Sequence, residues 1–156
     1  MEKFLENIAS AEKSLKTVDH LIYITFPLIK DKRILLKVIQ EIKTILTDCI
    51  KAILQYEYLY KRIRLYQNPK SNFKTFVEKC SKRYNISSEE IKIMLELFDY
   101  VEKHNESPFE FVRGEKIIIL SESLNPKILT LEKIKSFLFL AKDILRKTKE
   151  NIIRDY

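Results

Sequence analysis

The chain has 156 residues, enough for one domain with a sizeable core, and its 46% hydrophobic and 33% charged residues are typical of a folded protein rather than a disordered one. A single Gly and four Pro are too few turn formers for an all-β fold, and the abundant Leu, Lys and Glu favour helices. With 29 Lys and Arg against 22 Asp and Glu, the net charge of +7 favours acidic partners such as nucleic acid or an anionic membrane surface.

Targeting and redox signals are absent from the sequence. It has no signal-peptide pattern and no uninterrupted apolar run near the roughly 18 residues that span a bilayer. Cys49 and Cys80 lack Cys-x-x-Cys spacing, which favours a reduced, intracellular chain. We therefore expect a cytoplasmic protein with no membrane span.

The first predicted element is an amphipathic helix that starts near Phe4. Its apolar positions recur at alternating steps of four and three residues, which places them on one helical face. Pro27 should end or kink this helix, because its ring removes a donor and clashes with the preceding turn. The face consists of Phe4, Ile8, Ala11, Leu15, Val18, Ile22 and Thr25.

A second, longer helix is predicted over residues 32–66, which contain no Pro or Gly. At 1.5 Å per residue it would be roughly 50 Å long, and the short connection makes it antiparallel to the first. A second apolar row widens its stripe, so it should touch more than one neighbour. The main stripe is Leu35, Val38, Ile42, Ile45, Cys49, Ala52, Tyr56, Leu59 and Ile63, and the second row is Leu46, Ile50, Ile53 and Leu54.

The middle of the chain predicts shorter helices. Residues 72–84 favour one after the Asn68-Pro69 turn. Ser87 to Glu90 has the capping-box form that starts the next, which fades at residues 104–106. Ser107-Pro108 predicts a further one or two helical turns through Val112.

The last third contains the only β-like stretch. The runs 116–120 and 127–129 favour a small hairpin, and Thr130 should cap a final helix. The sequence therefore predicts one domain, residues 1–156, of mainly α class. We expect an antiparallel helical bundle built on a long N-terminal helical hairpin, with one small β-hairpin near residues 116–129.

Patterns that carry catalysis are missing. His20 and His104 are the only histidines, and neither has a second ligand one helical turn away. No Gly-x-Ser-x-Gly turn occurs, and one Gly is too few for a phosphate-binding loop. The sequence predicts no enzyme activity, no metal site and no cofactor.

The strongest functional pattern is a tyrosine-rich and basic stretch after Gln55. Aromatic rings beside cations are typical of RNA and single-strand binding. The structural alternative is that the tyrosines continue the core stripe and the cations complement the helix dipole. The candidate nucleic-acid-binding residues are Tyr58, Lys61, Arg62, Arg64, Tyr66, Lys70, Lys74, Lys82 and Arg83.

A second candidate is an anion-binding loop at Arg113 and Gly114. The guanidinium and the bare backbone would face an anionic ligand together. In the alternative interpretation, Gly114 only supplies a positive φ angle to a structural loop.

The compact basic bundle with its long hairpin resembles the HEPN superfamily, many of whose members are RNases. That activity relies on an Arg followed four to six residues later by His, and neither His20 nor His104 has such an Arg. Residues 11–63 and 111–141 are also similar to small uncharacterised archaeal helical proteins. That second resemblance implies a fold and no function.

These patterns leave three hypotheses open. The first is a non-enzymatic helical module that binds RNA or a ribonucleoprotein. The second is a homodimeric scaffold, in which self-association covers surplus apolar surface on the long helix. The third is an HEPN-like nuclease relative without the usual active site, using Arg113, His104 and carboxylates.

Overall fold

A computed structural model gives the fold. It describes the backbone of residues 2–106, 109–113, 116–120 and 126–153, and the side chains of these outside residues 105–127. The elements are α1 (Lys3–His20), the π-helical turn η1 (Leu21–Thr25), α2 (Phe26–Ile29), α3 (Arg33–Leu59), α4 (Pro69–Thr75), the π-helical turn η2 (Phe76–Cys80), α5 (Ser88–Glu106), β1 (Phe109–Arg113), β2 (Lys116–Leu120), β3 (Pro126–Thr130) and α6 (Leu131–Ile153).

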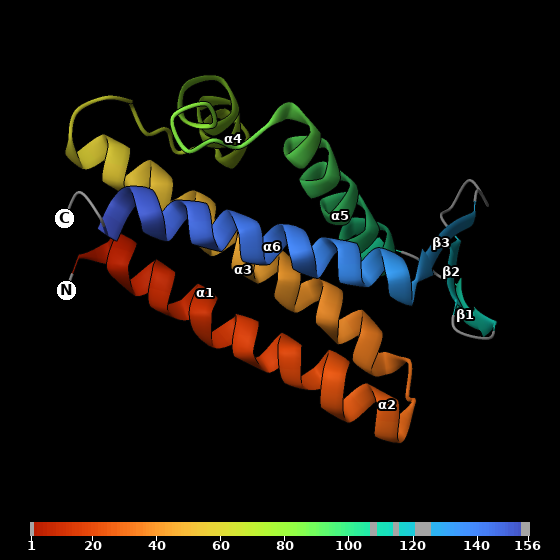
Figure 1. Ribbon diagram of the computed structural model, residues 1–156. Coiled ribbons are helices and arrows are strands. Elements are labelled where there is room, and N and C mark those ends of the chain that lie inside the picture. The colour runs from red at the N-terminus through yellow and green to blue at the C-terminus, as the bar shows by residue number, and fades with distance from the viewer. Residues whose placement is uncertain (1, 107–108, 114–115, 121–125, 154–156) are drawn as a thin grey trace.

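The long helices α1, α3, α5 and α6 form an antiparallel bundle (Figure 1). α1 and α5 run in one direction, and α3 and α6 run in the other. α3 lies at the centre, in contact with α1, α5 and α6. The start of α1 and the end of α6 lie at one end of the bundle, and the sheet lies at the other. The predicted fold class, a mainly α bundle built on a long N-terminal hairpin, is confirmed.

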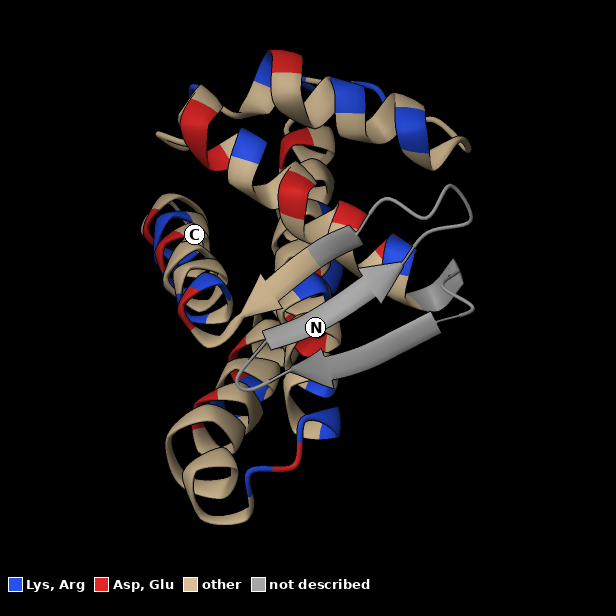
Figure 2. Cartoon of the chain, turned by 90° about the vertical axis from the view of Figure 1, so that its right-hand side faces the viewer, with Lys and Arg blue, Asp and Glu red and all other residues tan. Residues whose placement is uncertain are grey.

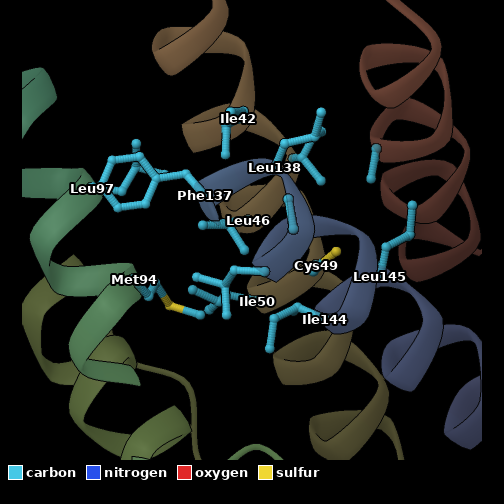
Figure 3. Packing of buried hydrophobic residues seen from close by; sticks show 14 of the residues in the cluster. Ile42, Leu46, Cys49, Ile50, Met94, Leu97, Phe137, Leu138, Ile144 and Leu145 are labelled. Carbon is cyan, nitrogen blue, oxygen red and sulfur yellow. The ribbon is translucent and has the colours of Figure 1, made fainter. Parts of the chain in front are cut away.

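The core forms around α3, as its wide apolar stripe predicts. Its apolar residues point toward three neighbouring helices, and most are fully buried. Figure 3 shows Ile42, Leu46, Cys49 and Ile50 of α3 beside Met94 and Leu97 of α5 and Phe137, Leu138, Ile144 and Leu145 of α6. Burying a Leu or Ile side chain contributes roughly 1.5–3 kcal/mol, so this one helix anchors the domain.

The predicted break at Pro27 takes the form of a π-helical turn. In η1 the Phe26 N–H donates to the Leu21 carbonyl, one residue further back than in an α-helix. Pro27 follows as the second residue of α2, two residues before the helix ends at Ile29, and it has no N–H to donate to the preceding turn. Lys30 adopts a left-handed conformation, with a φ of 56°, and closes the helix by donating its N–H to the Phe26 carbonyl at 2.8 Å.

The predicted helix starts at Ser87 and Thr130 are confirmed by their caps. The Ser87 N–H donates to Glu90 Oε1, and the Glu90 N–H donates to Ser87 Oγ, both at 3.1 Å. The Lys133 N–H donates to Thr130 Oγ1 at 3.1 Å. The capping box also joins two helices, because Lys147 Nζ of α6 lies 2.7 Å from Glu90 Oε1.

The predicted hairpin is present, and it is part of a larger sheet. β2 and β3 pair antiparallel, with Ile118 opposite Ile128. β1 adds a third strand, with Phe111 opposite Ile118. The expectation of helical turns through Val112 is therefore wrong, because pairing with the β-branched run of β2 satisfies this backbone as a strand. Tyr100 of α5 donates its hydroxyl to the Ile128 carbonyl at 2.7 Å and ties the sheet to the bundle.

Two further boundaries concern length. α3 ends at Leu59, so the prediction of a helix to residue 66 is wrong and its length is about 40 Å rather than 50 Å. The predicted helix over residues 72–84 begins earlier, at Pro69, and also ends earlier, because η2 closes it at Cys80. No helix in the described part of the chain is both long and apolar enough to cross a membrane.

Shortening one fully buried α3 side chain should destabilise the domain strongly. Ile45→Ala removes side-chain carbons at a fully buried position, and we expect a loss of about 3 kcal/mol in the free energy of unfolding. The measurement is urea denaturation followed by circular dichroism. Leu95→Ala, at a half-exposed position of α5, is the control. A loss at Ile45 no larger than at Leu95 would contradict this account of the core.

Candidate nucleic-acid interface

The candidate residues begin where α3 stops. Lys61 has a positive φ of 59°. Its N–H donates to the Tyr58 carbonyl at 2.9 Å, and the Arg62 N–H reaches back to the Glu57 carbonyl at 3.0 Å. This hydrogen-bond pair is a Schellman motif, which usually has Gly at the left-handed position. Because Lys61 and not Gly occupies the left-handed position here, the sequence did not indicate that α3 ends at this point.

Glu57, on the last turn of α3, is buried although it is ionisable, with 2% of its side chain exposed. Its carboxylate pairs with two cations from outside the helix. Arg62 Nη1 lies 2.8 Å from Oε2, and Arg83 Nε lies 3.2 Å from Oε1. The hydrogen bond that Arg62 donates to the Glu57 carboxylate raises the pKa of Arg62. Burial, followed by the nearby Glu57 charge, raises the pKa of Tyr84.

The Glu57 cluster changes the interpretation of two candidate residues. Arg62 and Arg83 each already have a carboxylate partner inside the protein, and about a third and a half of their side chains stay exposed. They join the end of α3 to the segment after η2. Arg62 also lies over the Tyr60 ring, 5.1 Å from its centroid. Both guanidiniums therefore have a structural role, which is to neutralise the buried Glu57 carboxylate.

The loop after Arg62 is held by a side chain of α4. Asn72 Oδ1 accepts from the Tyr66 N–H, and Asn72 Nδ2 donates to the Tyr66 carbonyl, both at 2.7 Å. Asn68 caps α4 by accepting from the Lys70 N–H at 2.9 Å. The double hydrogen bond fixes the Tyr66 backbone while leaving half of the residue exposed.

Three predicted residues meet in a small hollow beside this loop. Its volume is about 330 Å³. One acidic residue, Glu78, is at its edge, 3.9 Å from Lys74 Nζ. The hollow therefore combines an exposed aromatic ring with an excess of cations, a combination typical of surfaces that bind single-stranded nucleic acid. Its lining is Arg64, Tyr66, Ser71, Lys74, Thr75, Glu78 and Lys79.

Other predicted residues lie elsewhere around the end of α3. Tyr58 and Lys61 line a separate, larger hollow of about 1040 Å³ between the start of α1 and the end of α3. Lys70 and Lys82 are exposed, on α4 and after η2. Lys79 was not among the predicted residues, although it belongs to the small hollow. Lys79 lies five residues after Lys74, and residues at this spacing do not share a face of an α-helix. They line the same hollow here because η2 has a wider turn than an α-helix.

The basic excess of the whole chain is concentrated here. We define the basic segment as residues 58–86, which hold eight Lys and Arg residues and one acidic residue, Glu78. Since the chain has 29 basic and 22 acidic residues, the remainder contains 21 of each, so the segment accounts for all of the net charge of +7. Figure 2 shows the Lys residues of α4 along the helix at the top of the view.

The second candidate site, the anion-binding loop, lies largely outside the described residues. Arg113 ends β1 and pairs in register with Lys116. Its side chain and the whole of Gly114 lie outside the described residues. The anion-binding loop stays a prediction.

Other reactive groups are buried or scattered. Burial, together with nearby acidic groups, raises the pKa of Cys49 to about 12 and of Cys80 to about 11, so both thiols are protonated at neutral pH. His20 Nδ1 lies 3.1 Å from Thr25 Oγ1 across the π-helical turn. Within the described residues, no group of three His, Cys, Asp or Glu side chains is placed to hold a metal ion.

Removing the buried charge of Glu57 should loosen the basic segment. Glu57→Gln keeps the side-chain shape and removes two ion pairs, so we expect a loss of about 2 kcal/mol in the free energy of unfolding. Urea denaturation measures it. The control is Glu78→Gln, at an exposed carboxylate, which should cost less than about 0.5 kcal/mol. Equal losses in the two variants would refute a structural role for Glu57.

Comparisons with known proteins add no family to this description. No protein-family model, no curated protein and no solved structure matches the chain.

Proposed function

We propose that this protein is a non-enzymatic helical module that binds unpaired RNA through its basic segment, residues 58–86. The observation that carries the proposal is the concentration of the entire net charge in this segment. The charges of the rest of the chain sum to zero, so a polyanion meets the excess of seven positive charges here.

The tyrosines favour RNA with unpaired bases over other polyanions. Tyr58, Tyr60 and Tyr66 are each about half exposed among the cations. Base stacking on an aromatic ring is worth roughly 1–3 kcal/mol and requires bases that are not paired in a duplex. A purely electrostatic surface would need no such rings.

Some cations of the basic segment already pair with a carboxylate inside the protein, and this decides which residues we expect to contact phosphate. Arg62 and Arg83 hold Glu57, so their substitution confuses folding with binding. Arg64 and Lys79 line the small hollow, Lys70 precedes Ser71 of its lining, and none of the three forms an ion pair with another described residue. These three are the residues to change.

Neutralising these three cations should weaken RNA binding. In Arg64→Gln/Lys70→Gln/Lys79→Gln we expect the affinity for a single-stranded RNA oligonucleotide to fall by roughly tenfold or more at low salt. The slope of log K against log salt should become shallower by about 2, because each lost phosphate contact removes about 0.7. Fluorescence anisotropy across a salt series measures both quantities.

The matched control is Lys13→Gln/Lys16→Gln/Lys37→Gln, which removes the same charge from exposed positions of α1 and α3. It should leave affinity and slope close to those of the unmodified protein. An equal loss in both variants would show that net charge alone drives binding. No binding of the unmodified protein at low salt, or tighter binding to duplex DNA than to single-stranded RNA, would overturn the proposal.

A further inference from the structure

The tip of the first helical hairpin exposes several large apolar side chains to solvent. Leu21–Ile29, comprising η1 and α2, is a run of nine residues without a charge. Leu28 is 80% exposed and Ile29 is 65% exposed, and Tyr23 and Ile24 are each more than half exposed. Figure 2 shows this helical end at the bottom of the view, without Lys, Arg, Asp or Glu.

The exposure follows from where the first helix ends. The buried stripe of α1 continues through Ile22 to Phe26, four residues later. α2 then extends past the start of α3 (Figure 1), and its residues Leu28 and Ile29 are mostly exposed. Water-exposed Leu and Ile at a convex tip contribute nothing to the core, so their presence needs another cause.

Cations surround this apolar tip. Lys30, Lys32 and Arg33 follow it directly, with Asp31 as the one acidic residue between them, paired to Arg33 at 2.6 Å. On α6, Lys135 and Lys142 lie over the Tyr23 ring, 5.8 Å and 5.7 Å from its centroid. Lys142 is also paired with Asp19 at 2.9 Å. The local charge around the apolar residues is therefore positive.

The shape and charge of the tip argue against a second copy of the chain as its occupant. Its four exposed side chains present on the order of 500 Å², against about 800 Å² for each partner in a stable interface. A two-fold contact would also bring Lys30 and Lys32 of one copy toward those of the other. An anionic lipid surface needs no minimum protein interface area, because a small apolar tip can insert into it. Its negative charge also attracts the cations around the tip.

We propose that this tip inserts into the interfacial layer of an anionic lipid bilayer. Tyr23, Ile24, Leu28 and Ile29 enter the boundary between headgroups and acyl chains, and Lys30, Lys32 and Lys135 contact lipid phosphates. The insertion is shallow, and the tip does not cross the bilayer. The basic segment lies beyond the other end of α3, about 40 Å away, so it stays accessible when the tip is bound.

The chain contains no Trp, so one introduced indole reports on the tip alone. In Leu28→Trp we expect the emission maximum to shift to shorter wavelength when vesicles of phosphatidylcholine and phosphatidylglycerol in equal parts are added. Vesicles of phosphatidylcholine alone should give a much smaller shift. The control is Leu95→Trp, at a half-exposed position of α5, and its emission should not move.

A flotation assay with the same anionic vesicles tests whether the apolar side chains hold the protein there. Leu28→Ser/Ile29→Ser should lower the bound fraction several-fold, even at raised salt, and Leu95→Ser/Ile153→Ser should not. Arg64→Gln/Lys70→Gln/Lys79→Gln should remain bound, which separates this surface from the basic segment.

Three results would overturn the proposal: no shift in Leu28→Trp, flotation unaffected by Leu28→Ser/Ile29→Ser, or flotation lost only when the basic segment is neutralised. A blue shift without lipid that grows with protein concentration, together with a dimer in light scattering, would assign the tip to self-association instead.

Discussion

The burial of α3 on three sides is the constraint on which the rest of the structure depends. A helix with so wide an apolar stripe cannot be covered by one partner, so α1, α5 and α6 all pack on it. Its axis therefore sets the length of the bundle and separates its two ends. One end holds the apolar tip at α2, and the other leads into the basic segment. The two proposed surfaces are far apart because a single rigid helix lies between them.

The way α3 ends determines the chemistry of the basic segment. The left-handed turn at Lys61 directs the chain back over the last helical turn, and the Glu57 carboxylate, which is buried there, requires positive partners. Arg62 and Arg83 meet that requirement, so two of the cations neutralise an internal charge. Of the other cations, Arg64, Lys74 and Lys79 lie around Tyr66. A segment that is uniformly basic in sequence is thus divided by one buried carboxylate into structural and available charges.

Much of the fold was predictable because its signals are local and periodic. The apolar stripe of α3, the capping box at Ser87 and the cap at Thr130 each follow from short-range spacing, and the structure confirms them. The end of α3 was not predictable, because Lys61 takes the place that Gly usually fills. β1 was not predicted because its backbone hydrogen bonds are made with a partner strand, β2, and not within the segment itself. Its sequence does place Phe109 and Phe111 at the two-residue spacing of a strand.

Less of the candidate site was predictable. Residue type identified the cations and tyrosines, but only the structure distinguishes Arg62, held by Glu57, from Arg64 in the hollow. An ion pair between segments far apart in the chain cannot be recognised from the amino-acid composition. The π-helical turns have the same effect, since they shift the neighbours of a residue away from α-helical spacing, as for Lys74 and Lys79.

The central claim, that residues 58–86 hold the RNA surface, is tested most directly by photo-crosslinking. The full chain is irradiated with a single-stranded, uridine-rich RNA, and crosslinked peptides are identified by mass spectrometry. We expect crosslinks within the basic segment, with Tyr58 and Tyr66 the most frequent sites. Crosslinks that fall mainly on α1 or α6, or a uniform distribution over the chain, would contradict it.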